Sequence, residues 1–528
     1  MSAPASEKEV VSDDPYSEQR TEPHPAYDVK KEFSVYINLW MLGNTYWHLK
    51  RQNVLMSIRE LESPEFCYQV EIHNPSTGTD PNKVLLQFFI TSHIVFTFKT
   101  NKHCLEWNLP IYVNHCVFRA EFLKPEQEES FAAFWNQAFF EVAHKADLQS
   151  VCRSEADRKW ILQPSLDTSL PSKAPHKSMW NASERNSRHK AKNALLVENL
   201  LHHQIYVAQD QCFDAYQFTH NHNELKHLGK FPLSSVGSDH CFQPSQIMLM
   251  DESTKMLLLN PANTTKVTEI DLEICKVVRE YGSSNEWQIN QIAPMTKLET
   301  LTGQMEFLGI NDNSVFSIDP RQHGIDKLAQ VLSYSDAPHF SCITSSESGK
   351  IATGTSTGEI RLYADISKRA KTLLPGLGDA ITGLDITEDD QWVIATTTNY
   401  LLLIPTTHET ESYNGFQRSV SQHSRPPIKL QLKPEDMLKY NIRKLNFTRA
   451  HFNWGDNTEE WIVTSTGPYL VSWNFSELKE NHSRYDYQIK FCGNNVLANN
   501  FRFQNMDQVL VALPSDVYIE KRIQIKSN

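Results

Sequence analysis

Short β-strand patterns recur through residues 193–520 about every 45 residues, and this repeat restricts the possible folds more than any other feature. Each unit has a β-branched strand, a polar turn and a second strand that ends in an aromatic or aliphatic residue, as in residues 348–363, 389–404 and 459–473. Such units are typical of β-propeller blades. The length of the region predicts about seven blades, which are degenerate because the WD-repeat dipeptides Trp-Asp and Gly-His are mostly missing. Two β-sandwiches are the alternative.

Residues 33–148 show a different pattern, in which short strands precede one helix. Apolar residues alternate with polar ones in several stretches that are rich in β-branched or aromatic side chains: 54–60, 66–73, 84–89, 93–98 and 115–122. Apolar side chains then follow a helical spacing from Phe131 to Val142, and Trp135 is one of them. About seven strands and a closing helix resemble a small pleckstrin-homology-like (PH-like) barrel, whose helix usually buries a tryptophan. The predicted fold class is therefore mainly β.

The charge of the chain is uneven and helps to divide it into segments. The whole sequence has a net charge of −12, which argues against a nucleic-acid-binding protein. Residues 1–32 carry eight acidic and four basic side chains and predict a disordered acidic tail. Residues 149–192 are rich in Ser, Pro, Lys, Arg and His and predict a basic flexible linker. This linker would join the PH-like domain at 33–148 to a WD-repeat-like propeller at 193–528.

The sequence shows no stretch that is apolar enough to span a bilayer, and the first 32 residues lack the pattern of a signal peptide. Its nine cysteines are scattered without a CxxC pair, so we expect reduced thiols. These features predict a cytoplasmic protein. The nucleus and the surface of an endosome or vacuole stay open as further locations.

Several motifs of the propeller region resemble the vacuolar import and degradation protein twenty-seven family. They are FLGINDNSVFSIDPR (307–321), GEIRLY (358–363), KTLLPGLGDAITGLDI (371–386), QWVIATTTNYLLLI (391–404), IVTSTGPYLVSWN (462–474), VLANNFRF (496–503) and VALPSDV (511–517). The resemblance covers residues 245–520 and, less closely, 33–148. It implies a PH-like domain joined to a WD-repeat-like propeller, cytoplasmic residence, and a role in the vacuolar delivery and turnover of cytosolic proteins.

Motifs that would carry chemistry are incomplete. Residues 376–379 contain two glycines but lack the spacing of a phosphate-binding loop, and Ser465 lacks the glycines of a nucleophile elbow. His220, His222 and His227 lie in a polar stretch without a second pair to complete a tetrahedral metal site. We therefore predict no catalytic, cofactor or metal site. An enzyme with a site in the propeller channel stays a remote alternative that rests on fold analogy.

The sequence predicts instead a non-enzymatic, monomeric scaffold or adaptor whose partners are other proteins. The candidate partner contacts are polar residues that turns would place near a propeller face: Arg321, Arg361, Asp379 and Asp516. The alternative is a peripheral membrane adaptor that binds acidic lipid through the PH-like domain and the basic linker. The candidate headgroup ligands are cations placed near the first hairpin of the barrel: Lys50, Arg51 and Arg59.

Overall fold

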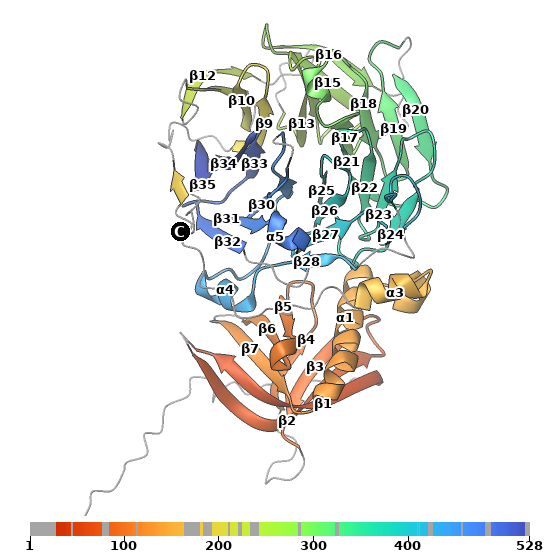
Figure 1. Ribbon diagram of the computed structural model, residues 1–528, viewed down its shortest axis with the longest axis vertical. Coiled ribbons are helices and arrows are strands. Elements are labelled where there is room, and N and C mark those ends of the chain that lie inside the picture. The colour runs from red at the N-terminus through yellow and green to blue at the C-terminus, as the bar shows by residue number, and fades with distance from the viewer. Residues whose placement is uncertain are drawn as a thin grey trace, which may run out of the picture.

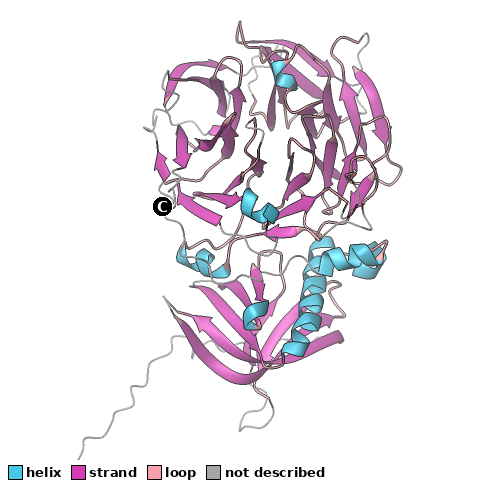
Figure 2. Ribbon diagram, in the orientation of Figure 1, coloured by secondary structure: helices cyan, strands magenta, loops and turns pink. Residues whose placement is uncertain are grey.

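Two β-rich domains lie end to end along the long axis of the molecule in the computed structural model of the chain (Figure 1). The structure describes residues 28–43, 46–75, 84–111, 114–162, 180–182, 193–209, 212–219, 224–232, 242–282, 287–322, 327–408, 410, 412–420, 426–455, 458–480 and 487–522. The smaller domain precedes the larger in sequence. Helices are few and gather largely where the two domains meet (Figure 2).

The smaller domain is a single antiparallel sheet of seven strands in the order β4-β3-β2-β1-β7-β6-β5. The strands are β1 (Val29–Leu42), β2 (Trp47–Leu61), β3 (Tyr68–His73), β4 (Val84–Phe89), β5 (Phe96–Lys99), β6 (Cys104–Ile111) and β7 (Asn114–Phe122). Helix α1 (Glu128–His144) packs its apolar face onto the sheet, and Trp135 is fully buried there against Phe96 and Phe131. The predicted arrangement of about seven strands followed by a closing helix is confirmed.

The larger domain is a ring of seven antiparallel sheets, each of four strands, and this confirms the predicted propeller and excludes two sandwiches. The strands of the first four blades are β9 (Asn193–Asn199), β10 (Gln204–Gln209), β11 (Cys212–Phe218), β12 (Leu225–Pro232), β13 (Gln246–Met250), β14 (Lys255–Leu259), β15 (Lys266–Asp271), β16 (Lys276–Gly282), β17 (Gln291–Pro294), β18 (Phe307–Ile310), β19 (Ser314–Ile318), β20 (Leu328–Ser333), β21 (Phe340–Ser345), β22 (Ile351–Thr355), β23 (Ile360–Tyr363) and β24 (Thr372–Leu374). The strands of the last three are β25 (Gly383–Ile386), β26 (Trp392–Thr396), β27 (Leu401–Pro405), β28 (Ile428–Leu430), β29 (His451–Phe452), β30 (Trp461–Thr466), β31 (Tyr469–Asn474), β32 (Tyr487–Phe491), β33 (Ala498–Arg502), β34 (Asn505–Ala512) and β35 (Val517–Arg522).

The outermost strand of the seventh blade comes from the segment that precedes the first blade in sequence. Strand β8 (Trp180–Ala182) pairs antiparallel with β35, so that Arg522 lies opposite Trp180. Because β8 precedes β9 in sequence, this pairing closes the ring with a strand from upstream. These three residues fall within the segment that was predicted as a linker.

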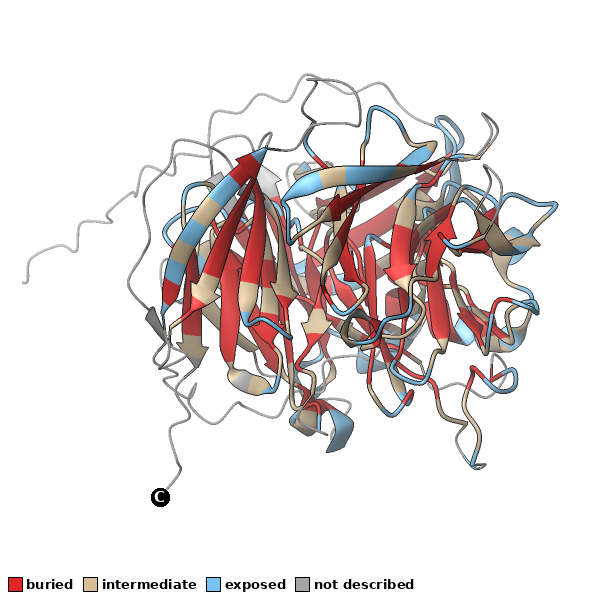
Figure 3. Cartoon of the chain, turned by 90° about the horizontal axis from the view of Figure 1, so that it is seen from above, coloured by how far each residue is buried: buried red, intermediate tan, exposed pale blue. Residues whose placement is uncertain are grey.

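The middle strands of the blades are almost wholly buried, since each blade packs both faces against its neighbours (Figure 3). Strand β27 illustrates the consequence, because its sequence LLLIP is continuously apolar and does not alternate. Outer strands such as β16 and β20 are mostly half-buried or exposed. Burial on two sides explains why the propeller strands could be recognised from short apolar runs between turns.

The segment after α1 is partly helical. Helices α2 (Leu148–Val151) and α3 (Glu155–Leu162) follow α1, and Trp160 and Ile161 are buried between the two domains. In the segment predicted as a basic linker, the cations at 173–192 lie outside the described residues, whereas Arg153, Arg158 and Lys159 are described. Most of the acidic tail also lies outside the described residues, and its last residues belong to β1. Two further short helices, α4 (Pro434–Lys439) and α5 (Phe475–Glu480), belong to the propeller region and were not expected. Three short 3₁₀ turns lie at 100–102, 125–127 and 299–301.

Candidate functional site at the domain interface

The barrel docks against propeller segments on one side of the fourth, fifth and sixth blades. These segments are the loop 375–382 after β24, the turn 397–400 between β26 and β27, strand β28, and the stretch 431–439 that contains α4. On the barrel side lie β5, β6, β7, the end of α1, and α3. The interface has an apolar half near α1 and α3 and a charged half near α4.

The apolar half is a hydrophobic core that both domains share. Phe140 of α1 and Trp160 and Ile161 of α3 belong to the same buried cluster as Leu374 and Ile381 of the propeller. The loop after β24 approaches α1 so closely that a Cβ on Gly378 would lie 3.1 Å from the carbonyl oxygen of Phe140. Gly378 also has a φ of +95°, which favours glycine. The two domains are therefore in close contact through apolar side chains and backbone.

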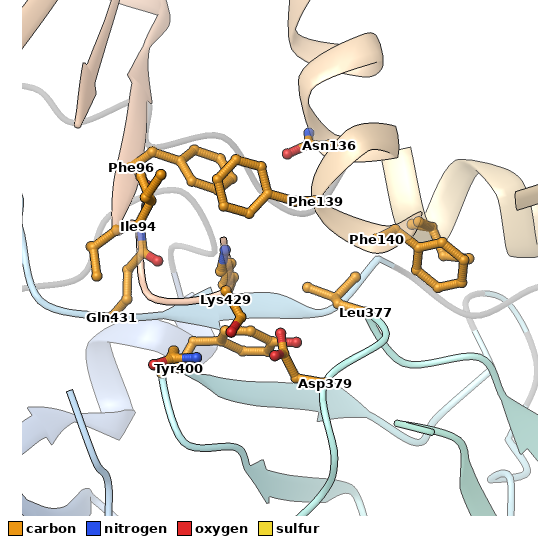
Figure 4. A pocket seen from close by; sticks show the side chains of 14 residues that line it. Ile94, Phe96, Asn136, Phe139, Phe140, Leu377, Asp379, Tyr400, Lys429 and Gln431 are labelled. Carbon is orange, nitrogen blue, oxygen red and sulfur yellow. Dashed lines mark hydrogen bonds between the residues drawn. The ribbon is translucent and has the colours of Figure 1, made fainter. Parts of the chain in front are cut away.

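A small cavity of about 40 Å³ lies in the interface between β5, α1 and the fifth blade (Figure 4). Lys429 of β28 enters it from the propeller. Its ammonium group lies 4.4 Å from the ring centre of Phe96 in the barrel and 4.7 Å from that of Tyr400 in the propeller. Asp379 lies at the same wall, beside Tyr400 (Figure 4). The space suffices for about two or three water molecules and for no larger ligand.

Burial governs the charges in this cavity. It lowers the pKa of Lys429 to about 8, and the nearby Asp379 carboxylate opposes the shift. Burial also raises the pKa of Asp379. The two groups therefore attract each other across the cavity at a cost in desolvation, and the ammonium group of Lys429 also lies over aromatic rings of both domains. The contact between Lys429 of the propeller and Phe96 of the barrel helps to hold the two domains together.

The charged half of the interface is a network across α4. Glu106 on β6 is fully buried and lies 2.6 Å from the ammonium of Lys99, and Arg119 on β7 is also paired with it. Glu435 of α4 lies 3.5 Å from Lys99 and 3.8 Å from Arg119, so the propeller supplies a second carboxylate to the same two cations. Gln431 donates a side-chain hydrogen bond to the carbonyl oxygen of Phe96 on β5. These contacts fix the orientation of the docked barrel.

A second buried polar cluster lies on the inner strands of the propeller. Lys297 donates to Asp385 at 2.9 Å, and Asp385 also accepts from the backbone nitrogen of Phe452 at 2.9 Å. Arg449 donates to the carbonyl oxygen of Leu384 at 2.7 Å. Burial, with Arg449 nearby, lowers the pKa of His451 to about 3, so this histidine stays neutral at physiological pH. These bonds connect the third, fifth and sixth blades, so the polar groups find their partners within the propeller.

Two of the predicted partner contacts are engaged inside the protein. Asp379 lines the interdomain cavity. The guanidinium of Arg361 lies 4.8 Å from the ring centre of Tyr334 and 3.0 Å from Glu359. Glu359 also pairs with Arg153 from the connection between α2 and α3, at 3.1 Å.

The other two predicted contacts lie nearer the surface. Arg321 has a side chain that is 62% exposed and makes two bonds to Asp319, at 2.9 and 3.1 Å. Asp516 is half-buried in the turn between β34 and β35, where its carbonyl oxygen accepts from the backbone nitrogen of Leu513. The structure therefore does not bring the four predicted residues together into one site.

The predicted lipid-headgroup residues are also separated. Lys50 and Arg51 are exposed near the start of β2, where its edge is not paired with β3. Arg59 lies about 25–30 Å farther along the same strand, given a rise of ~3.3 Å per residue. Arg59 contacts Glu71 at 2.6 Å and Glu32 at 3.3 Å. Exposed cations on an unpaired edge also protect it from pairing with other chains, which is a structural role for Lys50 and Arg51.

The residues that make the interface were mostly missed by the sequence analysis. Lys429, Gln431 and Tyr400 were not singled out. The only signal was the alternation of polar and apolar residues at 428–432, which shows that Lys429 and Gln431 share one strand face but not what covers that face.

The described part of the chain contains neither a candidate metal cluster nor a helix that could span a membrane. Within it, no group of three or more His, Cys, Asp or Glu side chains could hold a metal ion. Of the predicted histidines, His227 is described and lies 3.1 Å from Asp214, whereas His220 and His222 lie outside the described residues. No described helix is both long and apolar enough to cross a membrane.

Comparison with known proteins identifies relatives of the propeller. Residues 191–528 match the family model of the VID27 C-terminal WD40-like domain. The chain is 32% identical over 337 residues to Vacuolar import and degradation protein 27 of Schizosaccharomyces pombe, which covers 62% of this chain and 42% of that protein. It is 31% identical over 342 residues to the protein of the same name in Saccharomyces cerevisiae, covering 62% and 44%. The chain thus spans less than half the length of these relatives.

Among solved structures, the β-propeller domain of Cps50 (Swd1) from Myceliophteria thermophila is similar, with a TM-score of 0.47 and 11% sequence identity. The match covers 65% of this chain and 99% of that domain.

Proposed function

The chain belongs to the family of the VID27 C-terminal WD40-like domain, and from this premise we propose that it is a non-enzymatic scaffold that binds other proteins. The relatives are named for vacuolar import and degradation, so the proposed setting is the cytoplasmic handling of proteins that are delivered to the vacuole for turnover. In this proposal the chain acts as a monomer and uses no cofactor.

The observation that carries the proposal is the shared core between barrel and propeller. When two binding domains are joined by a flexible linker, binding at one domain raises the effective concentration of ligand at the other. Here Phe140, Trp160 and Ile161 of the N-terminal half are buried in one cluster with propeller residues, and Glu435 completes an ion network of the barrel. A fixed arrangement of this kind favours a continuous binding surface that spans both domains, because little ordering entropy is lost on binding.

The lipid-binding alternative does not enter this proposal. Arg59 is engaged by two carboxylates far along β2 from Lys50 and Arg51, so the three cations do not surround one headgroup. Arg153 of the predicted basic linker pairs with Glu359 of the propeller at 3.1 Å, and the linker cations at 173–192 lie outside the described residues, so the linker lends no geometric support to a headgroup site.

Affinity purification with mass spectrometry from the native cell tests the scaffold. Full-length chain is compared with Gly378→Val, which disturbs the interface, and with Gly229→Ala, whose added Cβ would meet nothing within 4 Å. We expect reproducible protein partners for the full-length chain and for Gly229→Ala, and the loss of part of that set for Gly378→Val. If no version recovers a reproducible protein partner, the scaffold function is wrong.

A further inference from the structure

A row of three aromatic rings lies on the sixth blade beside α4. The ring centres of Tyr440 and Tyr469 are 5.7 Å apart, and those of Tyr469 and Phe491 are 5.5 Å apart. The hydroxyl of Tyr469 donates to the carbonyl oxygen of Tyr440 at 2.7 Å, which fixes the first two rings. Phe491 is 56% exposed although it is large and apolar, and the two tyrosines are half-buried. The row is at most about 11 Å long, the length of about three extended residues.

Cations lie next to the Tyr440 end of this row, in space or in sequence. The ammonium of Lys439 lies 5.0 Å from the ring centre of Tyr440, and Arg443 and Lys444 are exposed on the loop that follows. None of these three cations forms an ion pair within the described part of the chain. We call this set of residues the blade-6 surface: Lys439, Tyr440, Arg443, Lys444, Tyr469 and Phe491.

The acidic groups near the blade-6 surface are engaged elsewhere. Glu435 faces Lys99 and Arg119, and Asp436 accepts a hydrogen bond from Tyr487 at 2.5 Å. The three cations of the surface outnumber these two carboxylates, of which Glu435 also serves two barrel cations, so the surface has a local excess of positive charge although the protein as a whole has a net charge of −12. A local basic patch on an acidic protein attracts a local negative charge and steers it to that place.

We propose that the blade-6 surface binds a short acidic segment of a partner protein that carries at least one aromatic or aliphatic side chain. This inference rests on the proposed scaffold function and names the chemistry of one partner. Carboxylates of the segment would pair with Lys439, Arg443 and Lys444, and its apolar side chain would pack on the exposed face of Phe491. Tyrosine and arginine are also the residue types that contribute most to protein interfaces.

The size of the surface favours a protein segment over a membrane or a nucleic acid. An extended polyanion would also meet the acidic remainder of the molecule, where repulsion opposes binding. A segment of a few residues meets only the three cations and the ring row. The rings offer apolar contact to side chains, which three isolated surface cations would not.

Photocrosslinking in the native cell tests the proposal on the full-length chain. Phe491→p-benzoylphenylalanine places a photoreactive ring at the exposed end of the row. We expect crosslinks to a protein segment whose sequence has a net negative charge. The crosslink yield should fall about tenfold when Lys439→Glu, Arg443→Glu and Lys444→Glu are combined, and should be retained with Lys439→Arg and Lys444→Arg.

Val278→p-benzoylphenylalanine on β16 is the matched control, since Val278 is likewise exposed but lies on the second blade. It should not capture the same segment. The charge-reversal variant must keep the melting temperature of the wild type, as expected for three exposed side chains. Crosslinks only to neutral or basic segments, to lipid, to nucleic acid or to this chain's own acidic residues 1–32 would overturn the proposal, as would a yield that charge reversal leaves unchanged.

The outcome separates this inference from the scaffold function. If affinity purification recovers partners while Phe491→p-benzoylphenylalanine captures none, the scaffold stands and the blade-6 surface is not its binding site. If neither experiment recovers a protein, both are wrong.

Discussion

The two halves of the domain interface are built in opposite ways. Near α1 and α3, large apolar side chains such as Phe140 and Trp160 enter a core that belongs also to the fourth and fifth blades. Near α4, charged side chains meet, and Glu435 shares Lys99 and Arg119 with the buried Glu106. Burial of apolar surface is strong and without direction, whereas ion pairs are weaker and depend on orientation. The apolar half should therefore supply the affinity of docking and the charged half its orientation.

The largest expected effect comes from the apolar half. Trp160→Ala should lower the free energy of unfolding by about 4 kcal/mol, because Trp160 is 3% exposed and its removal leaves a cavity between the domains. Urea denaturation measures this change. Tyr46→Ala is the control, since Tyr46 is 75% exposed and should change the stability little. Equal effects of the two substitutions would show that α3 is not part of the shared core.

The next effect depends on the charge that is buried in the apolar half. Because the pKa of Lys429 is about 8 in the folded protein and near 10.5 when solvated, the unfolded chain binds more protons between these values. The free energy of unfolding should therefore rise with pH, by about 2 kcal/mol from pH 8 to pH 10 relative to Lys429→Met. Thermal melts of both proteins across this range measure the difference. A difference that is constant with pH would contradict the lowered pKa of Lys429 in the folded protein.

A smaller effect tests how closely the loop 375–382 approaches α1. Gly378→Ala should cost about 1–2 kcal/mol, since it adds a Cβ 3.1 Å from a carbonyl oxygen at a residue with positive φ. Gly229→Ala on β12 is the matched control, because its added Cβ contacts nothing within 4 Å. The urea midpoints of the two variants measure the difference in stability. A Gly378→Ala protein as stable as the control would mean that the loop does not contact the helix.

The smallest effect belongs to the charged half. Glu435→Gln should cost at most about 1 kcal/mol at low salt, because Glu435 is more than one-third exposed and exposed pairs contribute little. The loss should disappear in 1 M NaCl, where the Debye length is about 3 Å. Melting temperatures at the two salt concentrations measure it. A cost as large as that of Trp160→Ala, or one that salt does not change, would reverse the assignment of the two halves.

The propeller could be predicted from the sequence because each blade repeats a local pattern. Strands such as β22 and β27 are short apolar runs between turns, and burial on both faces dictates that pattern wherever a blade occurs. The barrel could be predicted from the sequence equally well, since its closing helix shows a clear 3.6-residue spacing of apolar side chains around Trp135. Strand β8 could not be found in this way, because three residues in a basic segment have no periodicity and their partner strand lies more than 300 positions later.

The interface could not be predicted, because it depends on residues that are distant in sequence. Phe96, Tyr400 and Lys429 meet only after both domains have folded, and no local spacing records their contact. Asp379 was selected from the sequence as a partner contact near a propeller face, whereas it lines the cavity between the two domains. Arg361 was selected as an exposed contact, whereas its guanidinium packs on Tyr334 inside the molecule. A charged residue at a turn indicates that its side chain needs a polar partner, but the sequence does not show which part of the chain supplies that partner.

Fixed docking of the barrel on the propeller is the central claim, and a distance measurement between the two domains tests it most directly. Spin labels at Leu123 on the barrel and Val278 on the propeller replace exposed side chains outside the interface. Pulsed electron paramagnetic resonance on the full-length chain should give one narrow distance distribution, which broadens in the Trp160→Ala variant. A broad distribution in the wild-type background would contradict the account, because it would mean that the two domains move independently.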